Sequence, residues 1–408
     1  MTSVDKACLS LLDKLTGLAQ NHQMASEIAP NGVSALASNG FADRESEPVI
    51  ATVAALADAS AAIDPAMIDA AARAWSANTK RAFLSDLGLW GDWCRANRVR
   101  ASDADGKLVA KWVRALGGLE TERRLRTPIK RRAPATIARY LVHVGMAYRM
   151  AGLTDPTAAP LVKLELKAMR RARGTRQRQA KGIRYKGDIA DLDGPPTGVC
   201  LSHLLKACRR DWLGLRDAAL LRVAYDTACR RSELVAIEID HIEAGEGGAG
   251  VLFIPSSKTD AEGEGAYAYL SPATMQAIRV WKKATDIRSG PLLRRVEVHF
   301  DGSVSRVGNR PLHPNSITLI YRRLVRAAHA KGLLGETSEQ RLEQWVSDIS
   351  SHSVRVGVAQ DNFAAGEGLP AIMQAYRWRD PATVMRYGAR LAAQSGASAR
   401  LAKRFSSG

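Results

Sequence analysis

Apolar residues recur at three- and four-residue steps from residue 76 onward, a spacing that places side chains on one face of an α-helix. In the first such segment the apolar positions are Phe83, Leu87, Trp90 and Cys94. Ser76 or Asn78 can cap this helix, because their side-chain oxygens can accept N–H groups of the first turn. Further helical patterns lie over residues 106–116, 136–151 and 158–173. The sequence therefore predicts a bundle of about four or five helices.

Beyond residue 200 the period of the apolar positions changes. Helical patterns over residues 201–207 and 213–227 precede short segments that alternate or are rich in β-branched residues, separated by glycine-rich turns. These segments span residues 235–242, 250–254 and 266–270. They predict a small three-stranded antiparallel sheet. From residue 271 helical patterns resume to the C-terminus, with one polar loop over residues 301–309.

A loop-rich stretch between the two regions predicts a domain boundary within residues 174–198. Residues 187–198 hold two prolines, three glycines and few apolar side chains. The predicted fold class is mainly α (α+β). It combines a helical bundle over residues 66–178 with a mostly helical unit, containing the small sheet, over residues 179–408. Residues 1–65 are rich in Ala and Ser without a sustained helical period, which predicts a partly disordered extension.

The charge distribution indicates where a polyanion would bind. The formal net charge is +18 at pH 7, but residues 1–70 hold only three Lys or Arg against nine Asp or Glu. The rest of the chain therefore carries 56 of the 59 basic residues and 32 of the 41 acidic ones. A surface dense in Lys and Arg gains free energy by releasing counterions from phosphates. We expect a polyanion to contact the body of the chain and not its acidic extension.

Two runs of basic residues lie beside the predicted bundle. The first contains Arg123, Arg124, Arg126, Lys130, Arg131 and Arg132, and the second contains Arg170, Arg171, Arg173, Arg176, Arg178 and Lys181. Either run alone could be a solvated face or a flexible linker. Two such runs in so basic a chain favour phosphate contacts. The individual DNA contacts that we expect are Thr79, Lys80, Arg139 and Lys181.

Cysteine spacing and hydropathy argue against several other classes of protein. The five cysteines are odd in number and form no Cys-x-x-Cys pair, so neither a disulfide framework nor a zinc site is indicated. The apolar stretch over residues 49–63 is interrupted by Asp58 and is too short to span a bilayer. The start of the chain lacks a signal-peptide pattern. We expect a cytoplasmic protein with reduced thiols and no membrane contact.

Four short segments carry side chains suited to phosphoryl chemistry. They contain Arg230 with Glu233, Lys258, His352 with Arg355, and Trp378 with Tyr387. No metal-ligand motif or phosphate-binding glycine loop accompanies them in the sequence. The chemistry would then depend on Arg, Lys, His and Tyr. Two guanidinium groups can neutralise the charge that develops on a phosphodiester attacked in line.

The His-x-x-Arg segment has a simpler alternative when it is taken alone. His352 and Arg355 are three residues apart and would share one face of a helix. Ser350 or Ser351 can cap that helix, so its N-terminal amides would also favour an anion. An isolated His-x-x-Arg is nevertheless more often an ordinary surface pattern. The neighbouring segments have to decide between the two interpretations.

The remaining candidates have simple alternatives as well. Glu233 follows Arg230 by one helical turn and could hold its guanidinium, or could form a plain surface ion pair. Lys258 could be a solvated loop residue, although its ammonium group is protonated at neutral pH and could donate to a departing alkoxide. Tyr387 is one of nine tyrosines. A tyrosine becomes a nucleophile only when its proton is removed, for which guanidinium groups and a neutral histidine are suited.

The order and spacing of these residues resemble the tyrosine recombinase (phage integrase) family. Its pattern is Arg, then Lys in a β-hairpin, then His-x-x-Arg, then His or Trp, and finally Tyr. In this sequence the pattern is filled by Arg230, Lys258, His352, Arg355, Trp378 and Tyr387. The resemblance extends from about residue 71 to the C-terminus, and the last two hundred or so residues carry the specific motifs.

Two neighbouring residues compete with members of this pattern. Arg231 lies beside Arg230, and Tyr376 precedes Tyr387 by eleven residues. Glu233 falls three residues after Arg230, as the family pattern requires, which favours Arg230. Tyr387 keeps the nine-residue spacing from the tryptophan at position 378, which favours Tyr387 as the nucleophile. Glu233 would then support the site.

The resemblance implies a core-binding helical domain and a catalytic domain that close around DNA as a C-shaped clamp. Tyr387 would attack the scissile phosphate, giving a 3′-phosphotyrosine and a free 5′-hydroxyl. A homotetramer would exchange strands between two specific target sites. A C-terminal helix over residues 397–405, with Leu401 and Phe405 one turn apart, would dock into a neighbouring protomer. The same helix could instead fold back on its own domain.

The resemblance also implies a role for each member of the pattern. Arg230 and Arg355 would hold the nonbridging oxygens. Lys258 would act as general acid on the 5′-oxygen, and His352 would assist proton transfer. Trp378 would hydrogen-bond the phosphate. No metal, ATP, other cofactor or small-molecule substrate is implied.

Three alternative functions use the same residues or the same fold. A type IB topoisomerase would share the clamp and the nucleophile but relax supercoils as a monomer, and Trp378 with the docking helix argues against it. A telomere resolvase would make hairpin ends, but such enzymes are usually larger. A DNA-binding regulator could keep the fold without the activity. A covalent protein–DNA adduct would separate the regulator from the others.

Overall fold

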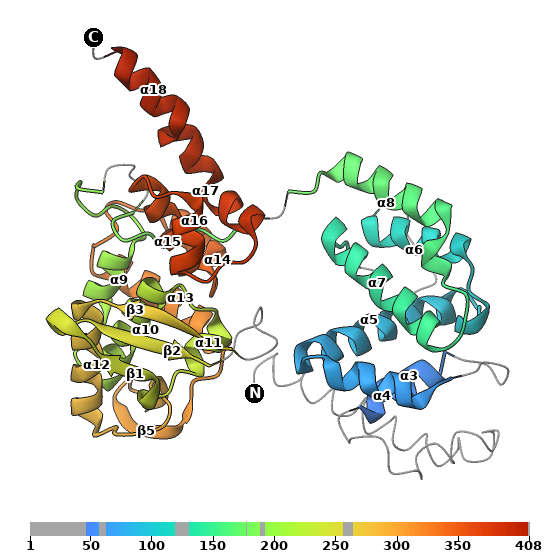
Figure 1. Ribbon diagram of the computed structural model, residues 1–408, viewed down its shortest axis with the longest axis horizontal. Helices are drawn as coiled ribbons and strands as arrows, with labels where there is room; N and C mark the ends of the chain where they lie inside the picture. Colours follow the sequence, from blue (N-terminus) through green and yellow to red (C-terminus); the bar gives the residue numbers. More distant parts are fainter. Residues whose placement is uncertain are drawn as a thin grey trace. The chain divides into compact units, whose positions relative to one another are not determined.

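The computed structural model describes residues 46–56, 63–118, 130–176, 178–187, 192–255 and 264–406, without the side chains of residues 390, 392–395 and 403. The chain divides into two compact units, Met1–Gln177 and Arg178–Gly408 (Figure 1). This division lies one residue before the sequence-based boundary at residue 178. Each unit has its own apolar core.

Unit 1 is a bundle of α-helices. Its helices are α3 Glu47–Ala54, α4 Pro65–Ala74, α5 Ala77–Ala96, α6 Gly106–Gly117, α7 Pro134–Met150 and α8 Pro160–Arg173, with 3-10 helices at Ala101–Asp103 and Pro156–Ala158. Of the two candidate caps for α5, Ser76 is the one used, because its hydroxyl accepts the Thr79 N–H at 3.2 Å. Asp105 caps α6 in the same way, through the Leu108 N–H at 2.9 Å.

Large aromatic side chains fill the core of unit 1. Trp90 and Trp112 are buried with their rings 5.0 Å apart, and Trp90 donates its indole N–H to the Tyr148 hydroxyl at 3.1 Å. Val49 and Val53 of α3 are fully buried in the same core. The helical unit therefore begins before the predicted boundary at residue 66. A helix this short is difficult to recognise from periodicity, because it presents only two turns.

A buried polar cluster joins α5 to α7. Asp86 on α5 is 1 % exposed, and its carboxylate accepts a hydrogen bond from Arg139 at 3.0 Å and pairs with Nδ1 of His143 at 2.7 Å. Burial raises the pKa of Asp86, while both partners act in the opposite direction. The carboxylate therefore depends on these two partners. It also holds the guanidinium of Arg139, whose side chain is 49 % exposed.

Unit 2 is mostly helical with two small sheets. Its helices are α9 Leu201–Ala207, α10 Trp212–Thr227, α11 Arg231–Val235, α12 Pro272–Thr285, α13 Ser316–Ala330, α14 Glu339–Asp348, α15 Ser353–Ala364, α16 Leu369–Ala375, α17 Pro381–Ser395 and α18 Ala397–Ser406. Its strands are β1 Ile242–Ala244, β2 Gly250–Ile254, β3 Ala266–Leu270, β4 Arg294–Val298 and β5 Val304–Pro311, with 3-10 helices at Ile239–His241 and Glu246–Gly248. The predicted fold class, mainly α with a small three-stranded antiparallel sheet, is confirmed.

The three-stranded sheet has the order β1-β2-β3 and is antiparallel throughout. In β2 the alternation of side chains is clean. Leu252 and Ile254 face the core, and Leu252 lies opposite Ile242 on one side and Ala268 on the other. Helix α10 packs against β3, α12 and α15, so it connects the sheet with the helices that carry the candidate site (Figure 1).

Two sequence-based assignments in unit 2 are wrong. The strand expected over residues 235–242 is instead the end of α11, a 3-10 turn and the first residue of β1. Its apolar residues alternate because they enter the core from a turn, where Ile239 donates to the backbone carbonyl of Gly290 at 3.0 Å. The polar loop expected over residues 301–309 is largely strand β5, which pairs with β4. Gly302, at φ +83°, provides the turn between them.

Residues 178–187 run across helix α15 of unit 2. The Ile183 N–H donates to the Ser353 carbonyl at 2.8 Å. A Cβ at Gly357 would lie 1.9 Å from the Ile183 carbonyl oxygen, so only glycine permits this approach. The first segment of unit 2 thus holds the helix that bears His352 at its start.

Two further features concern the cysteines and the hydropathy of the helices. Cys94, Cys200 and Cys229 are buried and free. Among the described residues, no helix combines the length and apolar character needed to cross a bilayer.

Candidate active site

Arg230 lies at the start of α11 and is fixed by Glu233. One carboxylate oxygen of Glu233 accepts the backbone N–H of Arg230 at 2.8 Å, and the other accepts its guanidinium N–H at 2.7 Å. Glu233 is buried, whereas the Arg230 side chain is 24 % exposed. The local sequence therefore forms the helix start and orients the guanidinium with the same carboxylate. Arg231 takes a different direction and donates to Asn315 at 2.9 Å.

His352 is the N-cap residue of α15 and directly precedes its first residue, Ser353. The helix starts later than expected, because Ser350 does not cap it directly. Instead the Ser350 hydroxyl accepts the His352 N–H at 3.1 Å, and the Ser353 hydroxyl accepts the Ser350 N–H at 3.0 Å. The turn before the helix is thereby closed on itself. Arg355 follows His352 within the first turn of the helix.

Arg355 is a buried cation that forms no ion pair with a carboxylate among the residues that the structure describes. It is 5 % exposed, donates a hydrogen bond to the backbone carbonyl of Ala228, and lies 5.3 Å from the centre of the Trp378 ring. Burial, and after it the nearby charge of Arg230, lower the pKa of Arg355 to about 10, while Glu233 acts in the opposite direction. At neutral pH the guanidinium remains protonated, at a cost in solvation.

The pKa of His352 is lowered as well. Partial loss of solvation is the first cause, and the positive charges of Arg355, Arg231 and Arg230 follow it. The side chain still reaches solvent. His352 is therefore neutral at pH 7 and able to accept a proton.

Trp378 lies between the guanidinium of Arg355 and the candidate tyrosine. It is 5 % exposed, and its indole N–H has no hydrogen-bond partner among the described residues. Its ring meets that of Tyr387 edge-on, with 6.1 Å between the ring centres. A buried N–H without an acceptor is costly, and an anion at this place would satisfy it.

Tyr387 and Tyr376 occupy different environments. Tyr387 lies on α17, is half-buried, and interacts electrostatically with Arg355. Tyr376 ends α16 and accepts a hydrogen bond from Asn362 at 3.1 Å. Burial raises the pKa of Tyr376, which disfavours its phenolate. The geometry therefore supports Tyr387 over Tyr376 as the residue that can act on a phosphate beside the arginines.

Six of the seven candidate catalytic residues lie in one cluster. They are Arg230, Glu233, His352, Arg355, Trp378 and Tyr387. Lys258 lies outside the described residues, in the connection between β2 and β3. Within the described part of the chain, no group of three or more His, Cys, Asp or Glu side chains is arranged to bind a metal ion. The cluster brings together the guanidinium groups of Arg230 and Arg355, and it is a candidate site for an anion.

Comparison with known proteins agrees with this geometry. Residues 200–394 match the phage integrase family. The chain is 27% identical over 338 residues to the recombinase Cre of Escherichia phage P1, covering 81% of this chain and 89% of Cre. It is also 27% identical over 318 residues to an integrase/recombinase XerD homologue of Selenomonas ruminantium, covering 76% and 81%. Over residues 200–394 the chain therefore matches the phage integrase (tyrosine recombinase) family.

A solved tyrosine recombinase structure shares the fold. The XerH site-specific recombinase bound to palindromic difH substrate, in a post-cleavage complex, has a TM-score of 0.50 with 11% identity, and the alignment covers 88% of this chain and 91% of XerH. The family resemblance expected from the sequence is thus confirmed.

The residues expected to contact DNA lie on both units of the recombinase. Thr79 and Lys80 are in the first turn of α5, where the Thr79 hydroxyl contacts that of Ser76 at 2.9 Å. Arg139 lies on α7, held by Asp86, and α5 packs against α7. Lys181 belongs to the segment before α9 and donates its backbone N–H to Asp348 at 3.1 Å. Three of the four thus lie on two adjacent helices.

Sequence reasoning missed the backbone groups that hold the site. The Ala228 carbonyl binds Arg355, and Gln360 donates to the Tyr387 carbonyl at 3.3 Å, which fixes α17 on α15. The first pair is 127 residues apart in the chain. No local pattern reveals such a contact, because a carbonyl is present at every residue.

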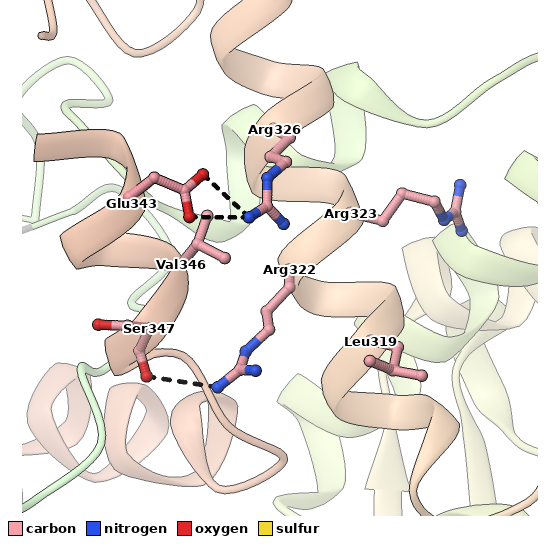
Figure 2. A pocket seen from close by; sticks show the side chains of 7 residues that line it. All are labelled: Leu319, Arg322, Arg323, Arg326, Glu343, Val346 and Ser347. Atoms are coloured by element: carbon pink, nitrogen blue, oxygen red, sulfur yellow. Dashed lines mark hydrogen bonds and ion pairs between the residues drawn. The ribbon is translucent and has the colours of Figure 1, made fainter. Parts of the chain in front are cut away.

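A cavity of about 450 Å³ between α13 and α14 lies apart from these residues. Its lining residues are Leu319, Arg322, Arg323, Arg326, Glu343, Val346 and Ser347 (Figure 2). Arg326 pairs with Glu343 at 2.9 Å, and Arg322 donates to the Ser347 carbonyl at 3.3 Å. Figure 2 shows Arg323 pointing away from both. None of the candidate catalytic side chains lines this cavity.

Proposed function

We propose that this chain is a site-specific DNA recombinase that cleaves and rejoins DNA through a 3′-phosphotyrosine at Tyr387. The carrying observation is the buried guanidinium of Arg355, which has no carboxylate partner among the described residues and lies against Trp378. Burying a charge without a partner is costly. A phosphate group bound beside Arg230 and Arg355 would supply the missing counter-charge.

The cleavage step follows from the chemistry of these groups. The Tyr387 oxygen attacks the scissile phosphorus in line, a new bond from phosphorus to the tyrosine oxygen forms, and the bond from phosphorus to the 5′-oxygen breaks. Arg230 and Arg355 neutralise the nonbridging oxygens. The indole N–H of Trp378, which lacks an acceptor, would donate to one of them. Glu233 fixes Arg230 through two hydrogen bonds.

Two proton transfers accompany this step. The phenol proton of Tyr387 passes to a base, and neutral His352 is suited to receive it because its pKa is lowered. The departing 5′-oxygen requires a proton, which we assign to Lys258 from the family pattern. Reversal with another 5′-hydroxyl rejoins the strands. Since one phosphodiester is exchanged for another, the cycle requires no ATP.

DNA binding would use both units. We assign phosphate contacts to Thr79, Lys80 and Arg139 on unit 1 and to Lys181 on unit 2. The net charge of +18 supports a polyanionic partner. A duplex held by both units would correspond to the C-shaped clamp of the family. Because the proposed substrate is duplex DNA, a cytoplasmic location follows from the proposal.

Strand exchange would require several protomers on two target sites, and we propose a homotetramer. Helix α18 leads away from the rest of unit 2 (Figure 1). Leu401 and Phe405, one turn apart on it, are 53 % and 77 % exposed. An apolar stripe on a terminal helix is suited to docking on a neighbouring copy.

The test is a covalent trapping experiment. Target duplexes are first selected from a random-sequence pool by binding to the protein, and are then nicked beside each candidate cleavage position. The wild-type chain is expected to form an adduct that survives denaturation. Tyr387→Phe should form none, because it lacks the attacking oxygen. Tyr376→Phe is the matched control and should retain adduct formation.

Two outcomes would reject the proposal. One is the absence of an adduct from wild type on DNA that it binds, and the other is an adduct that persists in Tyr387→Phe and disappears in Tyr376→Phe. Plasmids with one or two copies of the selected site distinguish related activities. Recombinant products from two-site plasmids support a recombinase, whereas relaxation alone would indicate a topoisomerase.

A further inference from the structure

Two residues near the site hold a backbone conformation that glycine normally provides. Ala228, after α10, has φ +45°, and Arg377, after α16, has φ +56°. Such left-handed residues commonly end helices, and glycine adopts the conformation with the least strain. At Arg377 the cap itself uses only backbone groups, since the Trp378 N–H donates to the Met373 carbonyl at 3.0 Å. The arginine side chain is therefore unnecessary for ending the helix.

The Arg377 side chain connects these two strained turns. Its Nη2 donates to the Thr227 carbonyl at 3.0 Å and contacts the Cys229 sulfur at 3.4 Å, across a separation of 150 and 148 residues. Its Nη1 is buried and has no hydrogen-bond partner among the described residues. The carbonyl between these two partners, that of Ala228, accepts the hydrogen bond from Arg355. The guanidinium groups of Arg355 and Arg377 therefore both bind the turn at residues 227–229, from two different elements.

The turn and the helix end each lead directly into the site. Arg230 follows Cys229 in the chain, and Trp378 follows Arg377. The Arg377 guanidinium adds positive charge to a cluster that is already cationic. In addition, the left-handed backbone of residue 377 is strained for any side chain other than glycine. Both costs are unnecessary for a cap. They are explained if the side chain fixes the distance between the two halves of the site.

We propose that Arg377 is a positioning residue, which holds the turn at residues 227–229 against the end of α16 and so aligns Arg230 and Arg355 with Trp378 and Tyr387. This inference rests on the proposed recombinase function for its effect on cleavage. Its structural part, the coupling of the two turns, can be measured without DNA. Arg377 acts through its neighbours and needs no contact with the phosphate.

The experiment compares two substitutions that fit the left-handed backbone. Arg377→Gly removes the guanidinium and the strain, and Arg377→Asn removes the guanidinium but keeps a side chain that tolerates this conformation. Ala228→Gly relieves strain in the partner turn and keeps the guanidinium, so it is the matched control. Hydrogen exchange is measured on the full chain at residues 227–231, which lie far from position 377 in the sequence.

We expect both Arg377 variants to keep the thermal midpoint and the DNA affinity of wild type. Amide exchange at residues 227–231 should accelerate by about tenfold or more, and single-turnover cleavage should slow by about 10- to 100-fold, as for loss of a hydrogen bond to a charged group. Methylguanidinium, below denaturing concentrations, should restore part of the cleavage by Arg377→Gly and none by Tyr387→Phe.

Unchanged exchange at residues 227–231 in both Arg377 variants would overturn the inference, whether or not the protein cleaves DNA. Full-rate cleavage by both variants would also overturn it. Parallel losses of thermal midpoint, DNA affinity and cleavage would assign Arg377 an ordinary structural role, which again rejects the proposal. Failure of wild type to form an adduct would instead reject the recombinase function, and the exchange measurement would still decide on the coupling.

Discussion

The two ends of helix α15 present opposite solutions to a buried charge. Near the C-terminal end, the Asp361 carboxylate accepts hydrogen bonds from Arg184 at 2.6 Å, from the Tyr185 N–H at 2.7 Å and from the Tyr225 hydroxyl at 2.6 Å. In the first turn, Arg355 has one backbone carbonyl and the face of Trp378. Asp361 and Arg355 are equally buried, at 7 % and 5 % exposure.

This difference separates a charge that holds elements of the fold together from a charge that would bind a phosphate. The carboxylate at position 361 accepts three hydrogen bonds, one of them from a guanidinium, and it fastens residues 184–185 and α10 to α15. The guanidinium at position 355 lacks a carboxylate within the described part of the chain, and the nearby Arg230 adds to the positive charge. A buried charge that is paired with an opposite charge stabilises the fold, whereas a buried cation without a paired anion is suited to bind an anion. Substitution at each end should therefore affect different quantities.

The largest expected effect is on stability, at the balanced end. Asp361→Asn removes the charge that pairs with the buried Arg184 guanidinium, and should lower the free energy of unfolding by about 3–5 kcal/mol. Urea denaturation of unit 2 measures this change. Asp348→Asn is the matched control, because its partner Arg178 is mostly exposed. It should cost no more than about 1 kcal/mol.

Equal losses of unfolding free energy for Asp361→Asn and Asp348→Asn would remove the basis of the comparison. The two pairs fasten the same segment, residues 178–187, to α14 and to α15. They differ in burial, because the Arg178 side chain is 70 % exposed and the Arg184 side chain is 4 % exposed. A large difference between them would attribute the stability of this end to the buried cluster.

The unbalanced end should respond in catalysis and not in stability. Arg355→Met keeps the apolar stem and removes the guanidinium, and cleavage of a trapped substrate should slow by about 10²–10³-fold, as for loss of one preorganised donor to a transition-state anion. The free energy of unfolding should stay the same or increase, because a poorly compensated buried charge is removed. Single-turnover cleavage and urea denaturation of the same preparation measure both quantities.

Arg326→Met is the control for removing an arginine from unit 2. Its ion pair with Glu343 is about half exposed on both sides, so it should change stability by less than about 1 kcal/mol. Cleavage should be nearly unaffected, because the cavity that Arg326 lines contains no candidate catalytic side chain. A loss of unfolding free energy in Arg355→Met comparable to that in Asp361→Asn would show that both ends of α15 serve structure, contrary to the comparison.

The sequence predicts the elements of this comparison unevenly. Helices α5, α6 and α7, and strands β2 and β3, follow from periodicity because each buries one regular face. Strand β1 and the hairpin β4–β5 do not, because β1 has only three residues and neither β1 nor β5 buries one regular face. Residues with special chemistry are recognisable by type and order. The charge balance around them is not, since it depends on pairs such as Arg184 with Asp361, which are 177 residues apart.

The same limit applies inside the site. Arg230 and Glu233 are three residues apart, so their contact follows from helical spacing. The Ala228 carbonyl and the Arg377 guanidinium have no signature that separates them from other carbonyls and arginines. Their importance comes from where the two left-handed turns meet. A sequence can therefore name the reacting groups of this site before it can name the groups that align them.

The smallest expected effect concerns His352, which reports the surplus charge directly. In the free protein its pKa lies below the ordinary value of about 6.5, through partial desolvation and then the charges of Arg355, Arg231 and Arg230. As pH falls below that value, the unfolded chain binds the proton before the folded chain does, so the free energy of unfolding decreases until the folded pKa is passed.

Binding of a duplex should raise the pKa of His352, because a phosphate offsets the guanidinium charges. Ring resonances in a pH titration by NMR, assigned with His352→Gln, measure both values. Arg355→Met should raise the pKa in the free protein and reduce the further rise on DNA binding. An unchanged titration of His352 in Arg355→Met would mean that the charge at this end of α15 is already balanced, and the contrast with Asp361 would then have no electrostatic basis.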